Sequence, residues 1–402
     1  MAPTCPRRVC TFSGASGGLS AERGIVSVQL GDQQRRRLHD TFTTLCRIPS
    51  PTGDERACAD WITEQLESFG LTVDEDDAGG AVGSSAGNLL ARVPGADSRS
   101  ILFCAHMDTV PPTAPVEPVQ VNGGWENANE GILGADNKAA VAALLELARI
   151  LTAGDEPPPV GVELLFTVAE ETGLNGAREF DVSKLLSQFG YVFDHASPWG
   201  EVIVSSPSHV AITAEIRGKA AHAGLHPEQG VNAIVAAAAA ITAMPQGRLD
   251  EHTTANVGTV VGGTAPNVVA DRCVIEAEVR SVVQERVDSF VTMAVDALED
   301  AADSAGCDLD ITLQQTFTGY VLDATEPSLQ LAQRALRRAG YEPRLVATGG
   351  GADANAFRVN GFECTNLANG TERAHERSER VSNASLEAGL EVLLAVLVEA
   401  AA

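Results

Sequence analysis

Short apolar runs rich in β-branched residues alternate with longer segments of helical periodicity through the first half of the chain. Strands are predicted at 71–76, 86–93, 100–106, 160–169 and 190–194, and helices at 32–47, 54–69 and 137–154. The helix at 137–154 is apolar nearly all round, so we expect it to be buried. This alternation predicts an α/β fold with a mixed, largely parallel sheet and helices on both faces.

The pattern changes between residues 206 and 315. Strands predicted at 209–218, 256–263, 268–281 and 308–317 are separated by helices at 231–244 and 285–306. This order is typical of an α+β ferredoxin-like unit. We therefore expect 206–315 to form a domain inserted into a first domain that comprises 31–205 and 316–402. The first domain resumes with a helix at 327–339, strands at 344–348 and 363–367, and a last helix from about 383.

Two stretches lack periodicity. Residues 1–30 mix Pro, Gly, Ser and Arg and have no apolar core of a secretory signal. We expect them to be a disordered extension or a segment outside the folded protein, with Val26 and Val28 as candidate start positions. Residues 110–134, rich in Pro and Gly, are predicted to be a long loop, and loops of that length are usually functional.

Composition excludes several classes of function. Of 402 residues, 44% are hydrophobic, and no apolar run approaches the ~18 residues of a membrane helix. Because 28 Lys and Arg oppose 54 Asp and Glu, the formal net charge is −26, which disfavours nucleic acid and anionic membranes as partners. The 8 cysteines are scattered without a Cys-x-x-Cys pair. This argues against a disulfide framework or a thiolate zinc site and favours a cytoplasmic location.

Two adjacent carboxylates, Glu170 and Glu171, follow the apolar run at 160–168. One could bind a metal while the other acts as a general base. An isolated pair of this kind could equally be a solvated acidic turn. The first interpretation is favoured because four further segments place a possible ligand after an apolar run, namely HMDTV (106–110), GADNK (134–138), FDH (193–195) and AHERSE (374–379).

The residues in these segments form a coherent donor set. His106 and Asp108 alternate after a strand, so Asp108 could fix the metal-binding tautomer of the imidazole. Asp136 either caps the following helix or bridges two metals, and Asp194 is either a ligand or an ordinary loop residue. His375 is the one histidine of the C-terminal third. With the glutamates, this nitrogen and oxygen inventory suits zinc, cobalt or manganese, and two metals can share it.

Seven ordered motifs carry a specific resemblance. They are HMDTV, ILGADNKAA, TVAEETGLNGA, GKAAHAGLHPEQGVNA, GTAPNVV, EVRS and GGGADANAF. From about residue 35 to the end, the chain resembles the di-metal exopeptidases of the aminoacylase and carboxypeptidase G clan, and most of all its peptidase T-like (tripeptidase-like) branch. The resemblance implies a phosphorylase/hydrolase-like zinc exopeptidase domain, two divalent cations (zinc first, cobalt or manganese otherwise) and a homodimer formed through an inserted lid domain.

The resemblance also implies roles for single residues. It gives a ligand for every metal position: His106 and Asp194 for one metal, Glu171 and His375 for the other, and Asp136 as the bridge. The Asp136–Asn137 peptide would be cis. Glu170 would be the general base, and Asp108 the partner of His106.

In the lid, the resemblance implies that His222 stabilises the oxyanion, usually across a dimer. Three further positions would contact the substrate, namely Asn267, Arg280 and Gly350. Arginine pairs with a carboxylate bidentately, although Arg280 alone could be an exposed charge at a strand end. Two positions depart from the pattern: Asn137 stands where tripeptidases commonly have a second Asp, and Ala352 replaces a frequent hydroxyl residue. Peptide length and the recognised substrate end therefore stay open.

These observations predict a cytosolic exopeptidase for small peptides, with a metal-bridging hydroxide as nucleophile and Glu170 as general base. One alternative keeps the chemistry and changes the substrate to an N-acyl or N-carbamoyl amino acid. A further alternative is a non-catalytic metal-binding dimerisation protein. Glu170 speaks against this last alternative because a scaffold needs no base.

Overall fold

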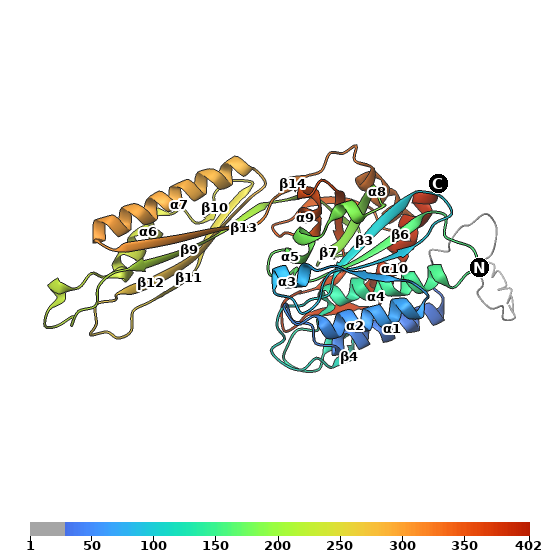
Figure 1. The fold of residues 1–402 in the computed structure, drawn as a ribbon, viewed down its shortest axis with the longest axis horizontal. Helices are drawn as coiled ribbons and strands as arrows, with labels where there is room; N and C mark the ends of the chain where they lie inside the picture. The colour runs from blue at the N-terminus through green and yellow to red at the C-terminus, as the bar shows by residue number, and fades with distance from the viewer. Residues whose placement is uncertain (1–28) are drawn as a thin grey trace, which may run out of the picture.

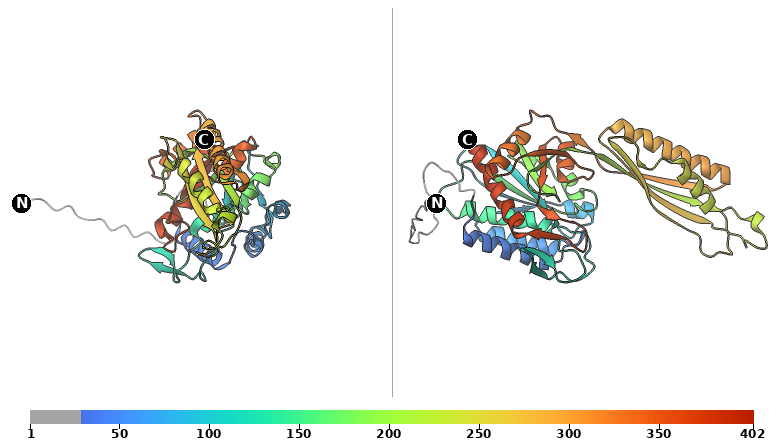
Figure 2. Two further views of the ribbon diagram at one scale, coloured as in Figure 1. Left: turned by 90° about the vertical axis from the view of Figure 1, so that its left-hand side faces the viewer. Right: turned by 180° about the vertical axis from the view of Figure 1, so that it is seen from behind.

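Two lobes of unequal size make up the chain, as the views from the front and from behind both show (Figures 1 and 2). The structure, a computed structural model, describes residues 29–402. The predictions for residues 1–28, including the candidate starts Val26 and Val28, lie outside the described residues. Within the described chain, no helix has both the length and the apolar character needed to cross a membrane.

The larger lobe is built on a sheet of nine described strands in the order β1-β2-β6-β3-β7-β16-β8-β14, with β15 beside β8. The strands are β1 (Val73–Glu75), β2 (Leu89–Val93), β3 (Ser100–His106), β6 (Gly161–Thr167), β7 (Phe189–His195), β8 (Glu201–Ser206), β14 (Tyr320–Val321), β15 (Arg344–Ala347) and β16 (Glu363–Ala368).

The sheet is mixed, as predicted, but it has as many antiparallel as parallel strand pairs, so the prediction that it is largely parallel is wrong. Parallel pairing joins β6, β3, β7 and β16 at the centre, and β15 to β8. The pairs β1–β2, β2–β6, β16–β8 and β14–β8 are antiparallel. Short connections explain part of the difference, because a parallel crossover needs a dozen or more residues and only 196–200 separate β7 from β8.

Helices cover both faces of this sheet, as predicted. They are α1 (Asp32–Arg47), α2 (Arg56–Ser68), α3 (Ala78–Val82), α4 (Ala135–Thr152), α5 (Asn175–Glu179), α8 (Pro327–Arg338), α9 (Asp353–Val359) and α10 (Asn383–Ala401). Successive side chains of β3 point to opposite faces: Phe103 joins the core beneath α1, α4 and α10, whereas Leu102 and Cys104 join the core beneath α5 and α9. Helix α4 is buried along most of its length, as its composition predicts.

A small antiparallel sheet, β17-β18-β5-β4, packs against helices α1, α4 and α10. Its strands are β4 (Pro118–Val121), β5 (Gly124–Asn127), β17 (Thr371–Glu372) and β18 (Arg380–Ser382). The predicted loop at 110–134 therefore contains a hairpin. Its turn is Asn122–Gly123, both with positive φ, which is the residue pair that two-residue hairpins favour. The surrounding prolines obscured this signal.

The smaller lobe consists of an antiparallel sheet, β10-β11-β12-β9-β13, packed against two helices. Its elements are β9 (Ser208–Arg217), α6 (Ala233–Ala243), β10 (Gly247–Arg248), β11 (Thr253–Gly262), β12 (Arg272–Ser281), α7 (Gln284–Ala305) and β13 (Asp308–Phe317). Apolar side chains of the sheet and of α6 and α7 form a core of their own. This lobe occupies the range of the predicted inserted domain, and that domain assignment stays a prediction.

The chain crosses between the lobes twice, and the two crossings lie side by side. Tyr320 of β14 is paired with Ser206 of β8. The backbone N–H of Gly319 donates to Oγ of Ser208 at 2.8 Å. A β-carbon on Gly319 would lie 2.6 Å from backbone atoms of Ser206 and Ser208, so only glycine fits this close approach.

Candidate metal centre

Four parallel strands, β6, β3, β7 and β16, end at the same edge of the main sheet, and the candidate ligands follow them. His106 ends β3, and Asp194 lies one residue before the end of β7. Strand β6 leads to Glu170 and Glu171, and the segment after β16 leads to His375. Because parallel strands open their carboxyl ends at one edge, side chains from distant parts of the sequence meet there.

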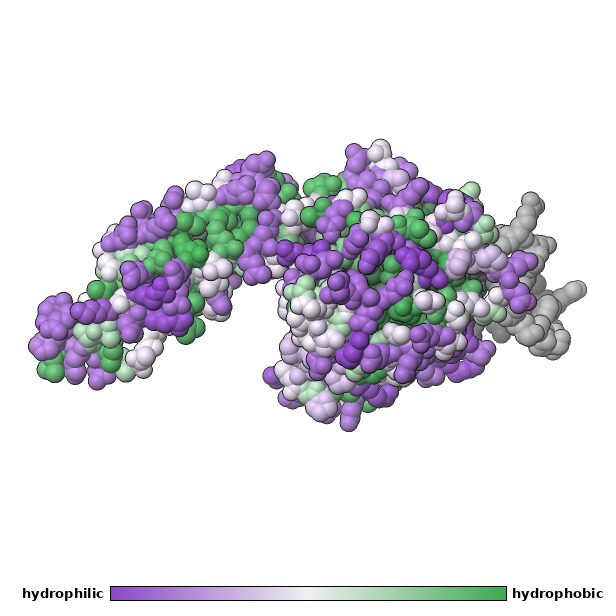
Figure 3. Space-filling model, viewed as in Figure 1, coloured by the Kyte–Doolittle hydropathy of each residue, from purple (hydrophilic) through white to green (hydrophobic). Residues whose placement is uncertain are grey.

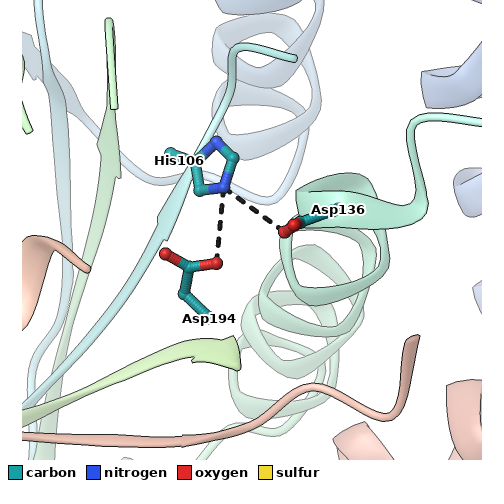
Figure 4. Close-up of side chains that lie close together, drawn as sticks. All are labelled: His106, Asp136 and Asp194. Atoms are coloured by element: carbon teal, nitrogen blue, oxygen red, sulfur yellow. Dashed lines mark ion pairs between the residues drawn. The ribbon is translucent and has the colours of Figure 1, made fainter. Parts of the chain in front are cut away.

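The first cluster contains His106, Asp136 and Asp194, from β3, the start of α4 and β7 (Figure 4). Nε2 of His106 lies 3.5 Å from Oδ1 of Asp136 and 3.6 Å from Oδ1 of Asp194. The other ring nitrogen, Nδ1, lies 3.0 Å from the carbonyl oxygen of Asp108. That contact assigns the proton to Nδ1, so Nε2 presents its lone pair to the two carboxylates.

The second cluster contains Asp136, Glu171 and His375. Nε2 of His375 lies 3.0 Å from Oε2 of Glu171 and 3.6 Å from Oδ2 of Asp136. One donor atom from each residue lies within 4.8 Å of the others. The two oxygens of Asp136 therefore face different histidines, which is the arrangement of a carboxylate shared between two cations.

Glu170 lies beside both clusters. Its carboxylate, a nitrogen of His106 and an oxygen of Glu171 all lie within 4.8 Å of one another, and Glu170 is buried. Burial, assisted by the negative charge of Asp194, raises the pKa of Glu170 well above its ordinary value. A carboxylate with a raised pKa is suited to proton transfer near neutral pH.

The donor chemistry fits cations. A hydrogen bond to Glu171, with the nearby charge of Asp136, raises the pKa of His375 to about 9. The cluster thus stabilises positive charge. Oδ1 of Asp136 is buried and makes no hydrogen bond, and buried polar atoms normally have a partner. Two imidazoles and three carboxylates without a thiolate suit zinc, cobalt or manganese, so these residues fit a shared two-cation site.

The peptide bond between Asp136 and Asn137 is cis, as the resemblance implied. The side chain of Asn137 is fully buried, and neither its Oδ1 nor its Nδ2 has a hydrogen-bond partner in the described chain.

The carboxylate of Asp108 supports the opposite side of the centre. It accepts hydrogen bonds from the backbone N–H groups of Glu170 at 3.0 Å and Glu171 at 3.2 Å, and from the hydroxyl of Thr52 at 2.7 Å. Its Oδ1 lies 3.4 Å from Nδ1 of His106. The closer contact of Asp108 with His106 is made by its backbone carbonyl rather than by its carboxylate. Its carboxylate anchors the loop that carries both glutamates.

His222 and Asn267 lie away from the metal centre. Strand β9 runs ten residues from the crossings before it reaches the loop of His222, a span of roughly 33 Å at the usual rise per residue. The backbone N–H of Ala223 donates to the carbonyl of Asn267 at 2.9 Å. These two predicted site residues are neighbours at the far end of the smaller lobe, and the structure does not bring them to the cations' ligands within one chain.

Arg280, in β12 of the smaller lobe, lies close to the segment of Gly350, which joins β15 to α9 in the larger lobe. Nη1 of Arg280 donates to the carbonyl of Gly349 at 2.9 Å, and its Nε and Nη2 donate to the carboxylate of Glu278. The carbonyl of Gly350 accepts a hydrogen bond from Oγ of Ser206 at 2.9 Å. Both residues therefore lie where the chain crosses between the lobes.

Two buried carboxylates close to the site were not singled out from the sequence. Glu379 accepts three backbone hydrogen bonds, and burial raises its pKa to about 7. Asp353 accepts a hydrogen bond from the hydroxyl of Thr167, and burial raises its pKa to about 6. Each lies within a motif noted above, AHERSE and GGGADANAF, but no local feature distinguishes it from an exposed acidic residue.

Comparison with known proteins agrees with this fold and site. Residues 102–399 match the model of peptidase family M20/M25/M40. The chain belongs to this family and is a peptidase T-like metallopeptidase, which confirms the resemblance noted from the motifs.

Individual relatives cover nearly the whole chain. An uncharacterised protein of Bacillus subtilis, YqjE, is 36% identical over 91% of this chain and 99% of its own. The crystal structure of aminopeptidase PepT from Bacillus cereus is similar with a TM-score of 0.82 and 35% identity, over 92% of this chain and 99% of that one. A tripeptidase structure from Staphylococcus aureus gives a TM-score of 0.86 and 34% identity, over 91% and 98%.

Proposed function

We propose that this protein is a cytosolic di-metal exopeptidase that hydrolyses peptide bonds of small peptides. The observation that carries the proposal is Asp136, whose two oxygens face different histidines beside the buried Glu170. The names of the Bacillus cereus aminopeptidase and the Staphylococcus aureus tripeptidase support a small-peptide substrate.

The proposed mechanism assigns each part of the cluster a task. When bound, two divalent cations would polarise the scissile carbonyl and lower the pKa of a water molecule towards about 7. One cation would be held by His106 and Asp194, and the other by Glu171 and His375, with Asp136 shared. The carboxylate of Glu170 accepts the proton of the attacking water and then donates it to the nitrogen of the leaving amine.

The smaller lobe extends the proposal to a homodimer. Because His222 and Asn267 lie far from the crossings, they can serve as substrate-binding residues when a second subunit presents them to the metal centre. Apolar surface is visible along this lobe (Figure 3), and the side chains of Val235, Val260 and Val261 are more than half exposed. Exposed apolar patches of this kind often mark protein interfaces.

Light scattering would measure the mass of the particle against the 41.9 kDa of one chain. We expect a dimer, and we expect the double variant Val260→Asp, Val261→Asp to be monomeric. Val359→Asp is the matched control because Val359 is similarly exposed on α9 of the larger lobe. A parent protein that is monomeric would contradict the proposed dimer but would not affect the proposal for the metal site.

A substrate panel tests the reaction. Di- and tripeptides are compared with N-acetyl and N-carbamoyl amino acids, with and without a chelator, and the metal content is measured by elemental analysis. We expect two cations per chain, cleavage of peptides, and loss of activity on chelation. Cleavage of the N-acyl or N-carbamoyl compounds alone would replace the peptidase with an amidohydrolase.

The role of Glu170 is tested by Glu170→Gln. The amide cannot take up the proton, so kcat should fall by about 10²–10⁴-fold while both cations are retained. Glu179→Gln, at an exposed glutamate of α5, should behave as the parent protein. Unchanged activity in Glu170→Gln would favour a site in which this residue has no part in proton transfer.

A further inference from the structure

Glu379 is a buried carboxylate near the metal centre but outside the proposed ligand set. Only 2% of the residue is exposed. Its Oε2 accepts hydrogen bonds from the backbone N–H groups of Leu133 and Gly134, and its Oε1 accepts one from Asp136, each at 2.8 Å. Three backbone donors converging on one buried carboxylate define the position of the segment that carries them.

That segment needs an external acceptor. Gly134 has a φ of +74°, and Asp136 has a non-helical ψ of 106°, so regular helix geometry begins only after these residues. The N–H groups of Leu133, Gly134 and Asp136 precede the regular helix and therefore need acceptors from outside it. Glu379 supplies those acceptors from a part of the chain more than 240 residues away. The direction in which Asp136 projects is thereby tied to Glu379.

Glu379 is also close in sequence to His375, a proposed metal ligand. Glu379 lies four residues after His375, in the turn that joins β17 to β18. Strand β18 pairs with β5, which belongs to the hairpin that precedes Asp136 in the chain. The small sheet and Glu379 therefore join the segment of His375 to the segment of Asp136 at two points.

We propose that Glu379 is a positioning residue that sets the separation between Asp136 and His375, and so controls the binding of the cation held by Asp136, Glu171 and His375. The inference rests on the proposed two-cation site. It predicts an effect on both cations, because Asp136 is shared. The effect should be larger on the cation held with His375, because Glu379 lies in the same turn as His375, whereas His106 and Asp194 are held by β3 and β7.

The variant Glu379→Gln tests this role with little change in volume. A glutamine has one acceptor oxygen, so its NH₂ group must face at least one of the three backbone N–H groups. Chelator-treated protein is titrated with Zn²⁺ by calorimetry, and the folded state is checked by thermal melting. We expect one of the two binding steps to weaken by about 10–100-fold and the other to weaken less, with a lower kcat and a similar KM.

Glu376→Gln is the matched control, because Glu376 lies in the same turn with an exposed side chain. It should bind both zinc ions as the parent protein does. If Glu379→Gln also binds both ions with parental affinity, the inference is overturned. If the parent protein itself binds fewer than two, the two-cation proposal fails first, and the two failures are thereby distinguished.

A second measurement needs no variant and so does not depend on the folding of Glu379→Gln. Hydrogen exchange followed by mass spectrometry compares the parent protein with and without Zn²⁺. We expect zinc to slow exchange in the segments 131–136 and 373–380 together, because Glu379 couples them. Protection of one segment without the other would contradict the coupling.

Discussion

Asp108 supports the metal centre without belonging to the proposed ligand set. Its carbonyl contacts the ring of His106, while its carboxylate accepts the backbone N–H groups of Glu170 and Glu171. One residue thus fixes the orientation of a proposed histidine ligand and the loop that carries the proposed base. Such supporting residues commonly control metal affinity nearly as strongly as the ligands themselves.

We expect Asp108→Asn to weaken cation binding by about 10–100-fold. The neutral amide has one acceptor oxygen, so one of the N–H groups of Glu170 and Glu171 loses its acceptor and the other loses a charged partner. Competition with a chromophoric chelator measures the affinity. Asp155→Asn, in an exposed loop, serves as the control, and equal affinities for the two variants would refute the supporting role.

The sequence predicted which side chains meet at the site better than it predicted what holds them. His106, Asp194 and Glu171 follow apolar runs, and parallel strands deliver such positions to one edge. Glu379 and Glu376 are locally alike, and only contacts with the distant segment before Asp136 bury the first and leave the second exposed. Long-range contacts of this kind cannot be predicted from the local pattern of residues in the sequence.

At the level of elements, helix α4 shows how a buried helix accommodates a charge. Glu146 has a fully buried side chain, and its carboxylate accepts hydrogen bonds from Nε of Arg37 on α1 at 3.0 and 3.2 Å. Burial raises the pKa of Glu146 even with Arg37 in place. The ion pair joins α1 to α4, so we expect its loss to weaken the packing of these two helices against each other.

We expect Arg37→Ala to lower the free energy of unfolding by about 3 kcal/mol, the low end for a broken buried pair, because Arg149 remains 3.4 Å from Glu146. A carboxyl group whose folded-state pKa is raised loses stabilisation as the pH rises through that pKa. Removing Arg37 raises the pKa further, so the deficit should be larger at pH 8 than at pH 5.

Urea denaturation at both pH values measures this deficit. Arg36→Ala removes an exposed neighbour on the same helix and should change stability little. A deficit in Arg37→Ala that is independent of pH would show that Glu146 is not its source.

Elements with long regular patterns were predicted within a few residues, including α4, α7 and α10. Some short strands, such as β1, β15 and β16, were also predicted, but others were not. Strand β8 and the hairpin β4–β5 became strands through pairing with β16 and β18, which lie more than 150 residues away in the chain. The predicted proportion of parallel strand pairs was too high for the same reason, because the pairing partner of a strand depends on contacts between distant parts of the chain.

For the molecule as a whole, the net charge of −26 opposes the compact state through mutual repulsion of surface carboxylates. Salt screens this repulsion, with a Debye length near 10 Å at 0.1 M. We expect the melting temperature to rise by a few degrees between about 0.05 and about 0.5 M NaCl. Glu67→Lys combined with Glu299→Lys, at exposed positions, should reduce this rise, and a melting temperature insensitive to salt would contradict the argument.

The pairing of Ser206 with Tyr320 has a consequence for how such a gene can be rearranged. The two segments that cross between the lobes are hydrogen-bonded neighbours. If residues 207–319 were deleted, a tight turn of a few amino acids would therefore reconnect them. All five proposed ligands and Glu170 would stay on the shortened polypeptide. The DNA encoding 207–319 could therefore be exchanged as one segment without changing any of the residues proposed to bind the cations.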